Sequence, residues 1–242
     1  MKHGEGHPWK SIRRLVNPAF RLGAIKALSG TFVEHSQRFA KKLVEFADTD
    51  KSINFQDEIS NMTLEIISSA GFSYPLNASP SNGFIKSLSR VTQQATNGLI
   101  FLPFGYKLLR WINNKHFDKI NDVFYSVIDE RIKQMEVEKK DPEKFTDILD
   151  FLLLPDEDGK QLTREEIRNE LFIFYVGGHE TTATVLSWAV YEIAKRPDIE
   201  KKLLDEIISY FGPSDGKSFI QPSVETLAEM RYLNMFLNEL LR

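Results

Sequence analysis

The stretch Val176-Gly-Gly-His-Glu-Thr-Thr-Ala-Thr184 lies inside a long helical pattern, which runs from about Thr163 to Arg196. Two adjacent glycines in the middle of a helix each cost about 1 kcal/mol relative to alanine. A helix that only filled a core would therefore not favour Gly177 and Gly178, and here an acid and two hydroxyl side chains follow them. We predict a groove at this point of a buried helix, where a flat, bulky molecule lies against backbone that carries no side chain.

The sequence also predicts where this long helix begins and ends. Thr163 and Glu166 have the spacing of a capping box. Lys195-Arg196 suits the negative end of a helix dipole, and Pro197 stops the helix. The run Leu171 to Val176 is apolar all round, which predicts that this part of the helix is buried on every side. Thr181 follows Gly177 by four residues, so its hydroxyl is expected to donate to the Gly177 carbonyl and loosen the helix.

The composition is that of a globular protein, with 242 residues, 42% hydrophobic and 27% charged. A net charge of -3 gives no reason to expect nucleic-acid binding. The sequence contains no cysteine, so its own residues provide neither disulfides nor a thiolate ligand. We find no signal peptide or other targeting segment, and no apolar run close to the roughly 18 residues of a membrane span.

Helical periodicity covers almost the whole chain, so we expect a mainly α fold and a single partial domain over residues 1–242. The best candidate for a strand is Ser52 to Phe55. Besides the long helix of about 163–196, the predicted helices cover residues 9–18, 25–46, 55–70, 84–97, 114–140, 145–152, 197–211 and 224–242.

Residues 98–112 are apolar but are interrupted by Pro103 and Gly105, and Lys107 and Arg110 lie among them. One interpretation is a loop that packs on its own core. The other is a surface that dips into a membrane interface, with aromatic and basic residues at its boundary. The residues leave both interpretations open.

Two catalytic or binding motifs begin in this sequence but are not completed. His179-Glu180 starts like the zinc-protease motif, but Ala183 stands where the second histidine is required. The stretch Gly212 to Ser218 has three residues between its glycines where a phosphate-binding loop has four, and it follows a helix where that loop follows a strand. The five histidines are scattered, so we predict no metal ligands among the side chains.

Three short motifs together resemble those of the cytochrome P450 family of haem-thiolate monooxygenases. Trp9-Lys-Ser-Ile-Arg13, with Pro18-Ala-Phe20 downstream, resembles the family's W-x-x-x-R helix. Gly177 to Thr182 matches its oxygen-activation pattern, and Glu239-Leu-Leu-Arg242 matches its E-x-x-R motif. The resemblance covers essentially the whole chain and implies the middle part of the family's helical fold.

The family holds the haem iron through a cysteine thiolate in a loop that follows E-x-x-R, and this sequence has no cysteine. We therefore expect a fragment that lacks both the N-terminal anchor and the cysteine loop, and that is inactive as it stands. The resemblance implies haem b as the cofactor, with its axial iron ligand absent from these residues.

The resemblance also assigns roles to particular residues. Trp9 and Arg13 are four residues apart, and both carry N–H donors for a haem propionate; the alternative is an ordinary basic helix. Gly177 and Gly178 let the helix approach the porphyrin, and Glu180 and Thr181 deliver protons during dioxygen activation. Phe174, Tyr175 and Ala183 line either the pocket or the core, and helical spacing leaves both open. Glu239 and Arg242 are expected to form a buried ion pair with a structural role.

For the full-length protein, the resemblance implies a monooxygenase that inserts one atom of dioxygen into an apolar organic substrate. It further implies electrons from NADPH through a reductase, and a location at the cytoplasmic face of the endoplasmic reticulum membrane. One alternative is a haem-thiolate isomerase or dehydratase, against which the acid and alcohol at Glu180-Thr181 argue. Another is a non-enzymatic helical protein, which explains the periodicity but not the three motifs.

Overall fold

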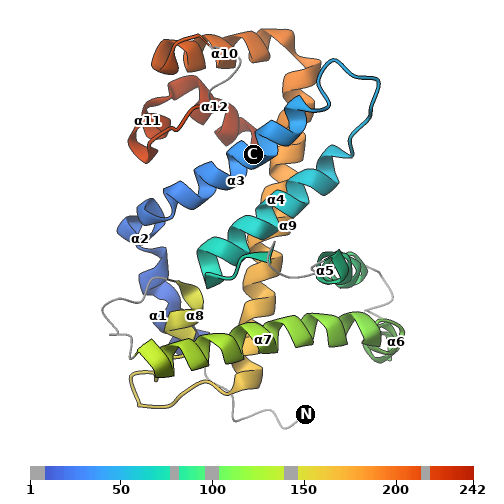
Figure 1. Ribbon diagram of the computed structural model, residues 1–242, viewed down its shortest axis with the longest axis vertical. Coiled ribbons are helices and arrows are strands. Elements are labelled where there is room, and N and C mark those ends of the chain that lie inside the picture. The colour runs from blue at the N-terminus through green and yellow to red at the C-terminus, as the bar shows by residue number, and fades with distance from the viewer. Residues whose placement is uncertain (1–8, 77–81, 96–103, 139–146, 214–218) are drawn as a thin grey trace. The chain divides into compact units, whose positions relative to one another are not determined.

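The computed structural model describes residues 9–76, 82–95, 104–138, 147–213 and 219–242, and all regular elements in these ranges are helices (Figure 1). The mainly α class is therefore confirmed. In chain order the helices are α1 Trp9–Val16, the 3-10 helix η1 Asn17–Phe20, α2 Leu22–Ala27, α3 Ser29–Val44, α4 Phe55–Phe72, α5 Asn82–Ala95, α6 Gly105–Ile112, α7 Asn114–Glu138, α8 Ile148–Leu152, α9 Arg164–Lys195, α10 Pro197–Phe211, α11 Val224–Glu229 and α12 Arg231–Leu240.

Packing divides the chain into two compact units. The first unit comprises residues 1–24 and 67–177, and the second comprises residues 25–66 and 178–242. Within α9 the division falls between Gly177 and Gly178, the two glycines singled out by the sequence. Whether the chain behaves as one partial domain stays a prediction.

The core of the first unit is an aromatic cluster around Tyr175 of α9, which is fully buried. Its ring stacks on Phe72 at a centroid distance of 4.8 Å and also contacts Phe84 and Phe124, on α5 and α7. The Tyr175 hydroxyl lies 2.8 Å from Ser68 Oγ. Burial raises the pKa of this hydroxyl, so it remains protonated and the cluster stays neutral. Tyr175 thus anchors the first half of α9 by apolar contact plus one satisfied hydrogen bond.

The long helix is confirmed with its capping box. The Glu166 amide donates to Thr163 Oγ1 at 3.2 Å, and the Thr163 amide donates to the Glu166 carboxylate at 2.7 Å. The prediction that Leu171 to Val176 is buried on every side is wrong, because Ile173 is 58% exposed while Leu171 and Tyr175 are fully buried. The apolar run therefore packs on one side only, although its sequence shows no polar face.

Two predicted helices are each divided in two. The helix predicted over residues 25–46 becomes α2 and α3, and at Leu28 the amide donates to the Ile25 carbonyl at 3.1 Å, a tighter bond than the α-helical one. The helix predicted over residues 224–242 is interrupted at Met230, whose backbone is extended with φ -69° and ψ 93°. Neither interruption has a glycine or proline at the break, so local sequence rules did not show it.

The loop interpretation of residues 98–112 is wrong for its second part, because residues 105–112 form helix α6. Phe104, just before the helix, has a positive φ of 68°. Gly105 thus stands at the first helical position and does not break the helix. Pro103 and the rest of the connection lie outside the described residues.

The strand predicted at Ser52 to Phe55 is also wrong. Asn54 caps α4, since its side-chain oxygen accepts the Asp57 amide at 3.3 Å, and Phe55 is the first helical residue. The remaining predicted helices correspond to α1 with η1, α4, α5, α7, α8 and α10, apart from ends that lie outside the described residues.

Candidate functional site

One face of α9 is open along the stretch that the sequence singled out. Gly177, Thr181, Thr184 and Trp188 recur at helical spacing, and all four are exposed. A Cβ atom built on Gly177 would meet no atom within 4 Å. The opposite face carries His179 and Ala183, which are buried. Gly177 therefore presents bare helix backbone to open space on the side where Thr181 lies, while Gly178 is half-buried.

Helix α4 supports this turn of α9 within the second unit. The buried hydroxyl of Thr63 donates to the His179 carbonyl at 3.1 Å. The His179 carbonyl, one residue after the glycine pair, thus accepts a hydrogen bond from outside α9. Sequence analysis did not find Thr63, since its partner is 116 residues away along the chain.

The hydroxyls after the glycine pair bond back to the helix. Thr184 Oγ1 donates to the Glu180 carbonyl at 2.8 Å, and Ser187 Oγ donates to the Ala183 carbonyl at 2.8 Å. Such bonds compete with the helical ladder and bend helices. The bond expected between Thr181 and the Gly177 carbonyl stays a prediction. Glu180, between the buried His179 and the exposed Thr181, is half-buried.

The three residues left open between pocket and core are now placed. Tyr175 belongs to the aromatic core described above, and Ala183 is buried. Phe174 stacks on Phe20 of η1 at a centroid distance of 6.1 Å, within the first unit. All three side chains therefore have packing contacts or burial that account for them without a ligand.

Trp9 and Arg13 form a pair on α1, as their spacing predicted. The Arg13 guanidinium lies 5.1 Å from the centroid of the Trp9 ring, a cation–π geometry. Trp9 is 67% exposed and Arg13 is also exposed, so both present N–H donors at the surface. Arg14, in contrast, pairs with Glu157 at 2.8 Å. Helix α1 thus carries an exposed donor pair, Trp9 and Arg13, and a neighbouring arginine that forms a surface ion pair.

Glu239 and Arg242 form the expected pair, with 3.5 Å between Glu239 Oε2 and Arg242 Nη1. The prediction that they are buried is wrong, because their side chains are 75% and 81% exposed. Exposed charges keep their hydration, so Arg242 does not suffer the loss of stability expected for a buried arginine with too few acceptors.

Taken separately, these features have the chemistry that a haem would require, apart from the iron ligand. Donors for a propionate stand on α1, in the first unit, and a bare backbone surface with an adjacent alcohol stands on α9. The thiolate that would ligate the iron is not among the residues of this sequence. Over the described ranges, no three histidine, aspartate or glutamate side chains gather as a metal site.

The fold and these motifs define a class of protein, and the chain belongs to the cytochrome P450 family. The family profile described as Cytochrome P450 matches residues 2–242. A crystal structure of a cytochrome P450 (CYP102L1) superimposes with a TM-score of 0.78 at 25% identity, covering 99% of this chain and 54% of that one.

Curated relatives come from animals and bacteria. Cytochrome P450 3A29 of Sus scrofa is 26% identical over 98% of this chain and 48% of its own length. Cytochrome P450 3A56 of Fundulus heteroclitus is 28% identical, over 98% and 49%. A bifunctional cytochrome P450/NADPH–P450 reductase of Bacillus cereus is 27% identical, over 97% and 22%. The chain thus spans about half the length, or less, of the curated relatives that it matches.

No helix in the described part of the chain is both long and apolar enough to cross a membrane.

Proposed function

We propose that the protein to which this sequence belongs is a haem-dependent monooxygenase that inserts one atom of dioxygen into an apolar organic substrate. Membership of the cytochrome P450 family supports the haem and the oxidative chemistry. The observation that carries the proposal is the open glycine face of α9, with Thr181 one turn after Gly177. Haem b, when bound, would supply the redox centre at which dioxygen is activated.

In this proposal the chain's own residues bind the cofactor and move protons. Trp9 and Arg13 would hold a propionate, because both are donors and a carboxylate accepts two such bonds. Gly177 and Gly178 leave room for a flat ring. Glu180 and Thr181 would pass protons from solvent through an ordered water, since a half-buried acid and an exposed alcohol supply the two proton-transfer groups.

The first experiment tests the ring-binding face. Gly177→Leu adds a side chain to that face yet uses a good helix former, so the helix should persist. Haem is titrated into the chain and followed by absorbance. We expect the affinity to fall by roughly tenfold or more, the effect of losing a shape-complementary contact of about 1.4 kcal/mol. Ala194→Leu, at an exposed position of α9 that shares a face with neither glycine, is the matched control. Equal affinities for the two variants would contradict the proposed face.

The second experiment tests the proton relay in the full-length protein. With Thr181→Ala, product formed per NADPH consumed should fall by up to about 10²-fold, the lower end of the contribution of positioned proton transfer. Thr181→Ser should restore coupling, and Thr182→Ala should not change it. Turnover that continues without dioxygen would instead favour the isomerase or dehydratase alternative.

A third experiment concerns the chain by itself, which we infer to be inactive. Haem added to it, reduced and exposed to carbon monoxide should give no thiolate-type Soret band, because the sequence offers no sulfur ligand of that kind. Appearance of that band would overturn this proposal but not the proposed function of the longer protein.

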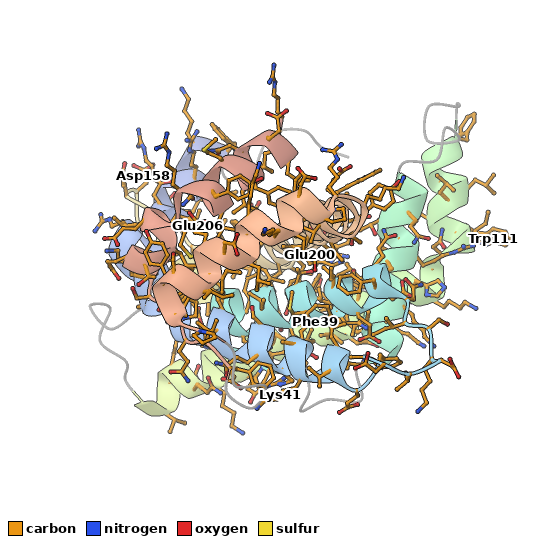
Figure 2. All side chains as sticks on the ribbon, turned by 90° about the horizontal axis from the view of Figure 1, so that it is seen from above. Phe39, Lys41, Trp111, Asp158, Glu200 and Glu206 are labelled. Atoms are coloured by element: carbon orange, nitrogen blue, oxygen red, sulfur yellow. The ribbon has the colours of Figure 1, made fainter. Side chains whose placement is uncertain are left out.

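Two partners follow from the proposal. The Bacillus cereus relative is named as a fusion with an NADPH–P450 reductase, which supports a reductase as electron donor here. We also propose contact with a membrane, placed by the family resemblance at the cytoplasmic face of the endoplasmic reticulum. Helix α6 and its N-cap support a membrane contact, because they expose Phe104 and Trp111, at 78% and 77%, beside the exposed Lys107 and Arg110 (Trp111 is labelled in Figure 2). Co-sedimentation with anionic vesicles should fall for a Phe104→Ser, Trp111→Ser double variant; unchanged binding would remove α6 from the contact.

A further inference from the structure

Helix α12, which carries Glu239 and ends two residues before Arg242, begins at an unusual place. The chain enters it through Met230, whose extended backbone separates α11 from α12. The N-cap residue of α12, Met230, makes no capping hydrogen bond with its own side chain. A helix start leaves its first amide groups without helical acceptors, so these groups need an oxygen from elsewhere. Here that oxygen comes from another helix.

The carboxylate of Glu206, on α10, supplies both acceptors. The Tyr232 amide donates to Glu206 Oε1 at 2.7 Å, and the Leu233 amide donates to Oε2 at 2.8 Å. These are the second and third residues of α12, the positions that an N-cap side chain normally serves. A negative charge at this end also complements the helix dipole. Glu206 is half-buried and lies on α10, where it is labelled in Figure 2.

A second contact holds the chain on the other side of Met230. The Tyr210 hydroxyl, one turn after Glu206 on α10, donates to the Glu229 carbonyl at 3.0 Å. The Asn234 side-chain amide then donates to the carbonyls of Leu227 and Met230, at 2.9 and 2.7 Å. Helix α10 therefore hydrogen-bonds to both the end of α11 and the start of α12, and side chains stabilise the interruption between the two helices.

We propose that Glu206 is a positioning residue: by capping α12 from α10, it sets where α12 begins and the direction in which Glu239 and Arg242 project. The capping role of Glu206 does not depend on the proposed haem chemistry. Its relevance to a haem site rests on the proposed function.

The test uses the full chain and its lack of cysteine, which allows clean labelling at introduced sites. Lys201→Cys on α10 and Asn238→Cys on α12 are both exposed positions for spin labels. Pulsed electron paramagnetic resonance then measures the distribution of distances between the labels. We expect one narrow distribution in the parent background and a broad or shifted one with Glu206→Ala. Asp205→Ala, a neighbouring exposed carboxylate on α10, is the matched control and should leave the distribution narrow.

Conservative variants separate positioning from general stability. Glu206→Gln keeps one acceptor oxygen and should give an intermediate distribution, with circular dichroism unchanged. Hydrogen exchange in residues 231–240 should accelerate by roughly tenfold with Glu206→Ala, the factor expected for losing a charge-assisted cap, while α10 keeps its protection. If Glu206→Ala loses its overall helicity, Glu206→Gln decides. A narrow, unshifted distribution in a folded Glu206 variant overturns the proposal, whatever the outcome of the haem experiments.

Discussion

Two of the arginine ion pairs in the described residues, at Arg131 and at Arg242, both use a carboxylate partner but differ in burial. Arg131 of α7 is buried and pairs with Asp147, with 2.9 Å between Nη1 and Oδ2, and with the fully buried Asp150. Its second terminal nitrogen donates to the Phe72 carbonyl at 2.8 Å. Arg242 has a single acid partner in Glu239 at 3.5 Å, and both side chains are largely exposed.

The difference shows that burial, more than the presence of a partner, decides what an ion pair is worth. Burial by itself would lower the pKa of Arg131, but the charges and hydrogen bonds of Asp147 and Asp150 raise it above its ordinary value. The buried arginine is therefore held charged by two carboxylates, and its contacts tie α7 to α8 and to the end of α4. An exposed pair in water gains almost nothing from its Coulomb energy.

The largest expected effect comes from removing the buried charge. Arg131→Met should destabilise the chain by about 3–5 kcal/mol, because it leaves two buried carboxylates without a counter-charge. Urea unfolding followed by circular dichroism measures this. Lys133→Met, two residues along the same helix and exposed, is the control and should stay within about 0.5 kcal/mol. A loss below about 1 kcal/mol for Arg131→Met would show that the cluster is more hydrated than its burial indicates.

Gly177 and Gly71 allow the same comparison between an open and a packed position, because alanine adds one Cβ atom at each. Gly177→Ala should stabilise the chain by up to about 1 kcal/mol, because alanine is the better helix former and its Cβ meets open space. Gly71→Ala should gain less or destabilise, since its Cβ would lie 3.2 Å from Ile67 Cδ1 and 3.5 Å from Ile148 Cδ1. Thermal unfolding of the two variants side by side gives the answer; equal shifts would mean that the room around Gly177 is not accessible.

Glu170 of α9 offers an intermediate case, where burial acts without a counter-charge. Burial, and then the negative charge of Glu166, raise the pKa of Glu170 above its ordinary value of 4.5. The folded chain therefore binds this proton more tightly than the unfolded chain does. Its contribution to stability is present below the ordinary pKa and is lost as the pH rises through the raised, folded value. Glu170→Gln should thus stabilise the chain more at pH 7 than at pH 4, because pH 4 lies below the ordinary pKa of 4.5. The same difference at both pH values would contradict this.

The smallest effect is expected at the exposed pair. Arg242→Ala should change the free energy of unfolding by no more than about 0.5 kcal/mol, because the pair is exposed and screened. Urea unfolding at low and high salt measures it, and the difference between variant and parent should shrink with salt. A loss of 2 kcal/mol or more, roughly the value of a desolvated charge contact, would place Arg242 among the structural charges of the isolated chain.

Much of the candidate site was accessible from the sequence because its signals are local. The caps of α9 use residues three apart, the Trp9–Arg13 pair uses residues four apart, and the glycine pair is contiguous. Thr63 and Glu206 were missed for the opposite reason. Their partners lie 116 and 26 residues away, and a threonine or glutamate on a helix carries no local sign of such a bond.

The sequence by itself determined the helical class, the ends of α9, the glycine pair and the three motifs, because helix propensity, capping and short spacing act within one or two turns. Only the tertiary structure decided that Ile173 is exposed, that the last helix is interrupted at Met230 and that Arg131 is charged in a core. Each of these depends on which side chains from distant segments supply apolar cover or hydrogen-bond partners. Burial and hydrogen-bond satisfaction are properties of the packed chain, and they fix what each residue of the pattern contributes.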